Sequence, residues 1–211
     1  MKQLRLKMNI ISDKKSSNIF FLEIGIFLFL LVLSFGGVIL KSFITKEPLI
    51  DESDLELIKA GKIISFIIIA PFMEEFFFRG FLNFERGKVY FVLFVIAALF
   101  IVSMKVNVGI NIIIIVLSVI LFLNNNLYKK MTYFISKYLI VLVIFSSVCF
   151  GLLHFINYEY FKFYNLLVIT PKILLGFFAA YITIRYNIWV ALICHSINNL
   201  LPTLLIYFTI G

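Results

Sequence analysis

Long runs of apolar residues separated by short polar stretches are the main pattern along this chain. Most runs reach the roughly 17–25 residues that a membrane-spanning helix needs. Because backbone polar groups must be paired within lipid, we expect each run to be helical. The pattern therefore predicts an all-α fold, a polytopic transmembrane helical bundle of about seven spans, with six or eight also compatible. The seven runs are 19–40, 61–84, 89–104, 106–123, 138–156, 165–184 and 187–209.

The third and fourth runs, 89–104 and 106–123, are the shortest, and little more than Lys105 separates them. They form either two spans or one helical hairpin that dips into the bilayer. No repeat, low-complexity tract or linker interrupts the chain elsewhere. We therefore expect a single integral membrane domain over residues 1–211.

Composition excludes two broad classes of protein. Hydrophobic residues make up 63% of the 211 residues and charged residues 14%, whereas soluble domains average about 45–50% and about 25%. A soluble globular domain and a disordered chain are both inconsistent with these values. The net charge of +8 fits cytoplasmic loops that meet anionic lipid. No basic stripe interleaved with exposed aromatic residues points to nucleic acid.

The distribution of Lys and Arg predicts the orientation. If the N-terminus is cytoplasmic, the inner segments carry about twice as many Lys and Arg residues as the outer ones. Such an excess marks the cytoplasmic side of a membrane protein. We expect a cytoplasmic N-terminus and an outer C-terminus.

Charged residues inside the second run are candidates for function, because ionisable groups within a span are costly. Glu75 and Arg79 are four residues apart and share a helical face, in the favourable order for an ion pair. Glu74 lies about 100° away and lacks that partner. A carboxylate placed in this way suits general acid–base work. The simpler alternative is an ion pair at the membrane edge, with both glutamates reaching toward water.

The two histidines of the chain, His154 and His195, both lie in apolar runs. His195 and Asn199 are four residues apart, so one helical face presents an imidazole and an amide that can stabilise an oxyanion. Alternatively, both histidines and one glutamate can hold a divalent metal such as zinc. Each histidine alone can also be a hydrogen-bonded packing residue.

Lys172 is a further charge within an apolar run, directly after Pro171. Three interpretations remain open for it. Its side chain can reach the interface, it can offset an acidic group, or the pair can mark a break in the helix.

Three motifs occur in order: E-E-x-x-x-R at Glu74-Glu75…Arg79, F-x-x-x-H at Phe150…His154, and H-x-x-x-N at His195…Asn199. Together they resemble the CPBP family of intramembrane proteases (CAAX protease and bacteriocin-processing, also called Abi). The resemblance extends over a core of about 61–205. It implies an all-helical membrane peptidase without a nucleophilic Ser or Cys.

The resemblance also implies roles for the motif residues. Glu74 and His154 would activate a water molecule, and His195 and Asn199 would stabilise the tetrahedral intermediate. Glu75 and Arg79 would organise the site. A metal-assisted mechanism, with a zinc-like ion on Glu74, His154 and His195, is the other mechanism that the family allows.

One feature departs from the family pattern: 80 residues separate Glu74 from His154, about twice the usual interval. An inserted helical hairpin at about 89–123 accounts for the excess. The expected setting is a bacterial cell membrane, with membrane lipid and a membrane-associated peptide as partners, in bacteriocin processing or self-immunity. The alternatives are a non-catalytic membrane scaffold or immunity protein that binds a peptide partner and, ranked last, a proton-coupled transporter.

Overall fold

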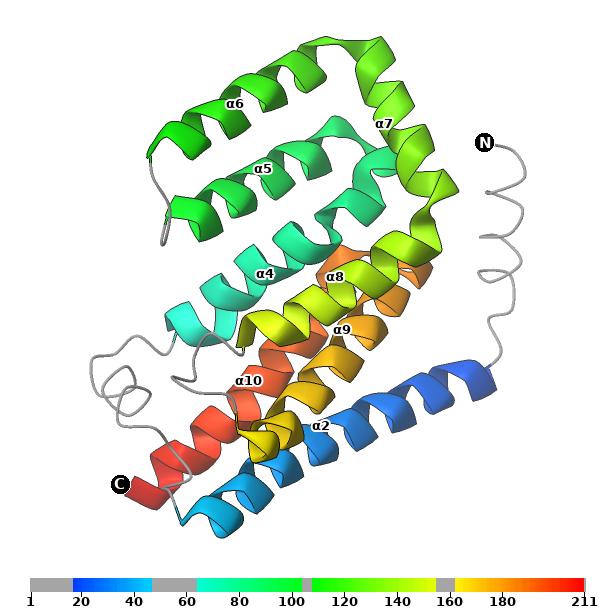
Figure 1. Ribbon diagram of the computed structural model, residues 1–211. Helices are drawn as coiled ribbons and strands as arrows, with labels where there is room; N and C mark the ends of the chain where they lie inside the picture. The colour runs from blue at the N-terminus through cyan, green and yellow to red at the C-terminus, as the bar shows by residue number, and fades with distance from the viewer. Residues whose placement is uncertain (1–16, 47–63, 104–107, 155–161, 211) are drawn as a thin grey trace.

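The computed structural model describes residues 17–46, 64–103, 108–154 and 162–210. Every regular element in these ranges is a helix (Figure 1). The all-α helical membrane bundle is therefore confirmed. The basic N-terminal segment, on which the predicted orientation partly depends, lies outside the described residues.

The described part of the chain forms eight α-helices and three short helical segments of other types. In order they are α2 (Ser17–Thr45), the π-helix η1 (Ser65–Ile69), α4 (Ala70–Arg79), the 3₁₀-helix η2 (Gly80–Arg86), α5 (Lys88–Ser103), α6 (Val108–Leu123), α7 (Asn125–Lys137), α8 (Leu139–Leu153), the 3₁₀-helix η4 (Phe163–Asn165), α9 (Leu166–Arg185) and α10 (Ile188–Ile210).

The helices stack in a sequence of layers (Figure 1). α4 lies between α5 and α10, and α6 packs on the far side of α5. α9 packs against α8, α10 and α2. The figure shows α4 and α9 running in the same direction, with α8 opposed to both. The elements that carry the three sequence motifs, α4, α8 and α10, therefore meet in the middle of the bundle, and α9 packs on all three.

The seven predicted runs are helical where the structure describes them, but their lengths differ. Two helices, Ile19–Thr45 and Phe163–Arg185, are long and apolar enough to cross a membrane. A third candidate is the pair Ile110–Leu123 and Asn125–Lys137, which is bent by 102°. Three further apolar helices are shorter than a usual span: Lys88–Phe100, Leu139–Leu153 and Ile188–Leu201. The integral membrane character is thus supported, and the count of seven spans stays a prediction.

Residues of the second run form three consecutive types of helix: the π-helix η1, the α-helix α4 and the 3₁₀-helix η2. In η1 the Ala70 N–H bonds to the Ser65 carbonyl, five residues back. Pro71 follows, and its missing N–H is tolerated in the first turn of α4. The next carbonyl in the π pattern, that of Phe66, thereby loses its backbone donor. This break leaves a backbone acceptor that faces α10.

α7 is an element that the sequence analysis did not predict. Asn124 caps it, because the Asn124 Oδ1 accepts hydrogen bonds from the backbone N–H groups of Asn126 and Leu127. Tyr128 donates its hydroxyl to the Phe84 carbonyl at 2.7 Å and so attaches α7 to η2. The helix is polar on one face, which is why a search for apolar runs passed over it.

Large apolar side chains cover the outside of the bundle. Phe21 and Val32 on α2, and Ile113 on α6, are all well exposed to the surroundings. Contiguous apolar surface of this extent is expected where the surroundings are lipid. Polar side chains instead gather inside, including Glu75, Arg79, Asn83, Ser147, Asn165, Thr183, His195 and Asn198.

A polar cluster fastens α2 to the end of α9. The Glu23 carboxylate accepts hydrogen bonds from Tyr181 at 2.6 Å and from Tyr186 at 2.5 Å. It also pairs with Arg185 at 2.8 Å. Glu23 is buried, so these three partners stabilise a carboxylate that lies on an otherwise apolar helix.

Candidate active site

A buried ion pair forms the base of the site. The Arg79 Nη1 donates to the Glu75 Oε1 at 3.0 Å, and both residues are almost fully buried, with exposed fractions of 0% and 1%. The spacing of four residues on α4 produces this contact, as expected from the sequence. Asn83, one further turn along, is also buried. A polar stripe therefore runs along one face of α4 and η2.

Residues of α8 and α9 enclose the guanidinium of Arg79. Its carbon lies 4.2 Å from the centre of the Phe150 ring, close enough for a cation–π interaction. On α9, Gly176 leaves room for this guanidinium. A Cβ atom on Gly176 would lie 3.1 Å from the Arg79 Nη2 and 3.0 Å from the Ser147 carbonyl oxygen. Phe150 of the middle sequence motif thus stabilises Arg79 of the first motif.

Glu75 also holds the imidazole of His195. Its Oε1 lies 2.8 Å from the His195 Nδ1, across 120 residues of sequence. A carboxylate paired with Arg79 accepts hydrogen bonds, so we assign the proton to Nδ1. In the neutral ring the His195 Nε2 is then left as an acceptor. Arg79, Glu75 and His195 form a continuous row in which each group orients the next.

Glu74 faces the free nitrogen of that imidazole. Its Oε2 lies 3.6 Å from the His195 Nε2, which is too long for a hydrogen bond. The side chain of Glu74 is 30% exposed, in contrast to 1% for Glu75. Two adjacent carboxylates therefore have different surroundings. Glu75 is almost fully buried and hydrogen-bonded, whereas Glu74 is partly exposed and its buried Oε2 faces an imidazole.

Asn199 lies one turn beyond His195 on α10. Its Nδ2 donates to the Phe66 carbonyl at 3.3 Å, the acceptor that Pro71 leaves without a backbone donor. Asn198 donates to the Asn199 Oδ1 at 3.4 Å. The amide is thereby oriented, and its second N–H has no partner among the described residues.

His154 caps the end of α8. Its Nδ1 is 2.9 Å from the Phe150 carbonyl oxygen, which can only accept, so Nδ1 carries the proton and Nε2 is an acceptor. The rings of His154 and His195 both pack on Phe150, with centroid distances of 5.0 and 5.4 Å. No hydrogen bond or ion pair joins His154 to Glu74 or His195 within the described ranges.

The expected metal ligands are consequently not gathered into one set. Within the described residues, no group of three His, Cys, Asp or Glu side chains is arranged to hold a metal ion. Glu74 and His195 approach each other, and His154 is turned toward its own backbone. We therefore derive no step through a metal.

Four buried polar residues near the motifs were missed from the sequence: Asn83, Ser147, Thr183 and Asn198. Asn83 continues the four-residue spacing of Glu75 and Arg79, so helical periodicity was a usable signal. Ser147 and Thr183 gave no signal, because hydroxyls are common in apolar helices. Polar atoms of Asn83, Ser147 and Thr183 lack partners among the described residues, which is typical of sites for buried water.

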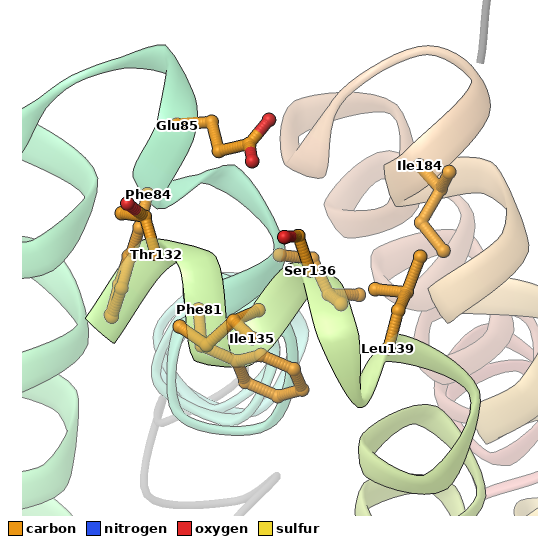
Figure 2. A pocket seen from close by; sticks show the side chains of 9 residues that line it. Phe81, Phe84, Glu85, Thr132, Ile135, Ser136, Leu139 and Ile184 are labelled. Atoms are coloured by element: carbon orange, nitrogen blue, oxygen red, sulfur yellow. The ribbon is translucent and has the colours of Figure 1, made fainter. Parts of the chain in front are cut away.

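Two cavities accompany the site without containing its motif residues. One, of about 570 Å³, lies between α4, α5 and α8 and is lined mainly by apolar side chains, Phe77, Phe78, Phe145 and Leu152 among them. The other, of about 30 Å³, lies between η2, α7 and the ends of α8 and α9 (Figure 2). Its volume suits only a water molecule or two.

Comparison with known families decides the relationship. The family model described as type II CAAX prenyl endopeptidase Rce1-like matches residues 57–201, more than half of the chain. The chain belongs to the Rce1-like family. Comparisons with curated proteins and with solved structures gave no match.

Membership of the Rce1-like family indicates the general type of activity. The chain is an integral membrane protein and belongs to a family of intramembrane endopeptidases. The matched range contains all seven residues of the three motifs and also α5 to α7, while α2 lies before it. The resemblance drawn from the three motifs is thus confirmed.

Proposed function

We propose that this protein hydrolyses a peptide bond of a membrane-associated peptide or protein through a water molecule activated by Glu74. One observation carries the proposal. The Arg79–Glu75–His195 row leaves the His195 Nε2 as an acceptor, 3.6 Å from the Glu74 Oε2. A water molecule that donates one hydrogen bond to each atom fits this separation.

The reaction then needs no covalent intermediate. As the carbonyl carbon approaches, the water proton moves to Glu74 and the water oxygen bonds to that carbon. The carbonyl oxygen becomes an oxyanion, and the second N–H of Asn199 donates to it. Glu74 returns the proton to the leaving nitrogen, the C–N bond breaks, and a carboxylate and an amine are released.

The histidines have accessory roles in this scheme. His195 orients the water, held in place by Glu75. His154, with its Nδ1 committed to Phe150, presents the Nε2 as a second acceptor for water, which supports the role that the family resemblance implies for it.

The surroundings favour an apolar substrate. Phe77 and Phe78 follow Glu74 on α4 and line the cavity of about 570 Å³, so an apolar segment bound there lies close to the site. We propose a membrane-associated peptide in a bacterial cell membrane, with the N-terminus of the enzyme cytoplasmic and bacteriocin processing or self-immunity as the role. A prenylated peptide, as the family description suggests, is the first substrate to try.

Replacement of Glu74 tests the proposal. In proteoliposomes that contain a membrane-anchored reporter peptide, Glu74→Gln should lower turnover about 10²–10⁴-fold, the usual contribution of a general base. Glu85→Gln is a matched control, because Glu85 is an exposed glutamate of η2. Unchanged turnover in Glu74→Gln would reject the assigned base. Biological protection retained without turnover would favour a non-catalytic binding protein.

A further inference from the structure

Lys172 is a charged residue of α9 to which the scheme above gives no role. Its position follows from the contact between Gly176 and Arg79, where a Cβ on Gly176 would lie 3.1 Å from the Arg79 Nη2. α4 and α9 run in the same direction (Figure 1). One turn back from this contact lies Glu75 on α4 and Lys172 on α9. Because the guanidinium at this contact is itself hydrogen-bonded to Glu75, Lys172 lies within about one helical turn of the acidic pair along the bundle.

A second contact, between α8 and α9, places Lys172 relative to His154. Gly151 packs directly on Ile173, since a Cβ there would lie 2.2 Å from the Ile173 Cγ1 and 2.9 Å from its backbone nitrogen. Lys172 precedes Ile173, and His154 follows Gly151 by three residues. The ammonium is accordingly within electrostatic range of both Glu74 and His154.

With the His195 ring neutral, the charges of the site balance when Lys172 is included. Arg79 is hydrogen-bonded to Glu75, so this pair is neutral. Glu74 is a second carboxylate, and no arginine or lysine makes an ion pair with it in the described ranges. Lys172 likewise makes no hydrogen bond or ion pair with another described residue. An unbalanced charge within a membrane protein costs several kcal/mol, so the two opposite charges stabilise each other.

We propose that Lys172 is the counter-ion of Glu74, which keeps this carboxylate ionised and therefore able to accept the proton of water. Lys172 is a positioning residue in this scheme, since it acts through Glu74. The inference rests on the proposed function, in which Glu74 is the base. The other groups that face Glu74 are Glu75 and Arg79 from its own helix and His195 from α10.

The pH dependence of turnover distinguishes this role from a structural one. We expect Lys172→Met to move the acid limb of the kcat/KM profile toward higher pH by about 1–3 units, because a nearby cation favours the charged form of a carboxylate by that amount. Turnover at a pH below the limb should fall about tenfold per unit of that displacement. Lys172→Arg keeps the charge and should restore the limb. Lys172→Gln provides a second neutral variant if the methionine variant does not fold.

An infrared titration of the carboxyl groups gives a readout without turnover. The band of protonated Glu74, identified by its absence in Glu74→Gln, should appear at higher pH in Lys172→Met than in the parent protein. An unchanged acid limb and an unchanged band in the neutral variants would overturn the inference, whether or not the rate falls. An arginine variant shifted as far as the methionine variant would also overturn it. Full turnover in Glu74→Gln would instead reject the proposed function itself.

Discussion

Replacing Gly151 by alanine should push α8 and α9 apart. The new Cβ would lie 2.2 Å from the Ile173 Cγ1 and 2.9 Å from the Ile173 backbone nitrogen. Non-bonded carbons pack at about 3.5–4.0 Å, so the overlap exceeds 1 Å and part of it is with backbone. A change of rotamer at Ile173 therefore cannot remove it. His154 lies three residues further along, so turnover should fall as well.

The magnitude follows from a comparison with Gly36→Ala. A Cβ at Gly36, on α2, would meet nothing within 4 Å. Both variants gain the helix propensity of alanine, about 1 kcal/mol, so their difference isolates the overpacking at Gly151, about 1–3 kcal/mol. For a chain of this length that difference corresponds to a Tm gap between about 2 and 12 °C.

Thermal unfolding of the detergent-solubilised protein, followed by intrinsic fluorescence, measures the gap. Ile173→Ala removes the Cγ1 atom and leaves the backbone nitrogen, so the cost of Gly151→Ala should shrink in that background without vanishing. The reasoning is refuted if Gly151→Ala unfolds at or above the temperature of Gly36→Ala. It is also refuted if Ile173→Ala leaves the cost unchanged.

Two further predictions concern the anchor of α2 and the metal alternative. Glu23→Gln should lower the free energy of unfolding by about 1–3 kcal/mol, because Tyr181 and Arg185 lose a charged acceptor. Glu85→Gln should change the Tm little, and an equal drop in both variants would contradict the argument. Incubation with a chelator should leave turnover unchanged, because Glu74, His154 and His195 are not arranged as a metal-holding set among the described residues. Turnover lost on chelation and restored by zinc would establish the metal-assisted mechanism instead.

Local features of the site were predictable from the sequence. The pairing of Glu75 with Arg79 depends only on helical geometry, since residues four apart share a face. The order of the three motifs was enough to indicate the family, because each motif lies on one helix. The helical break before Glu74 was not predicted, although Pro71 was visible. The partner of the Phe66 carbonyl at this break, Asn199 of α10, was likewise decided only by the fold.

Contacts between helices could not be predicted in the same way. The sequence grouped His195 with Asn199 and Glu74 with His154, whereas the structure places His195 between Glu75 and Glu74. Lys172 had three open interpretations, and the registers of α9 against α4 and α8 favour the one in which it offsets an acidic group. α7 was missed because its apolar residues do not form a continuous run.

Composition and apolar runs alone determined that the chain is a helical membrane protein, because lipid leaves the backbone few other ways to satisfy its hydrogen bonds. Spacing within one helix determined which side chains share a face. Only the tertiary structure decided which faces meet. That choice depends on the rotation and register of each helix against its neighbours, and in this protein close contacts at Gly151 and Gly176 set both.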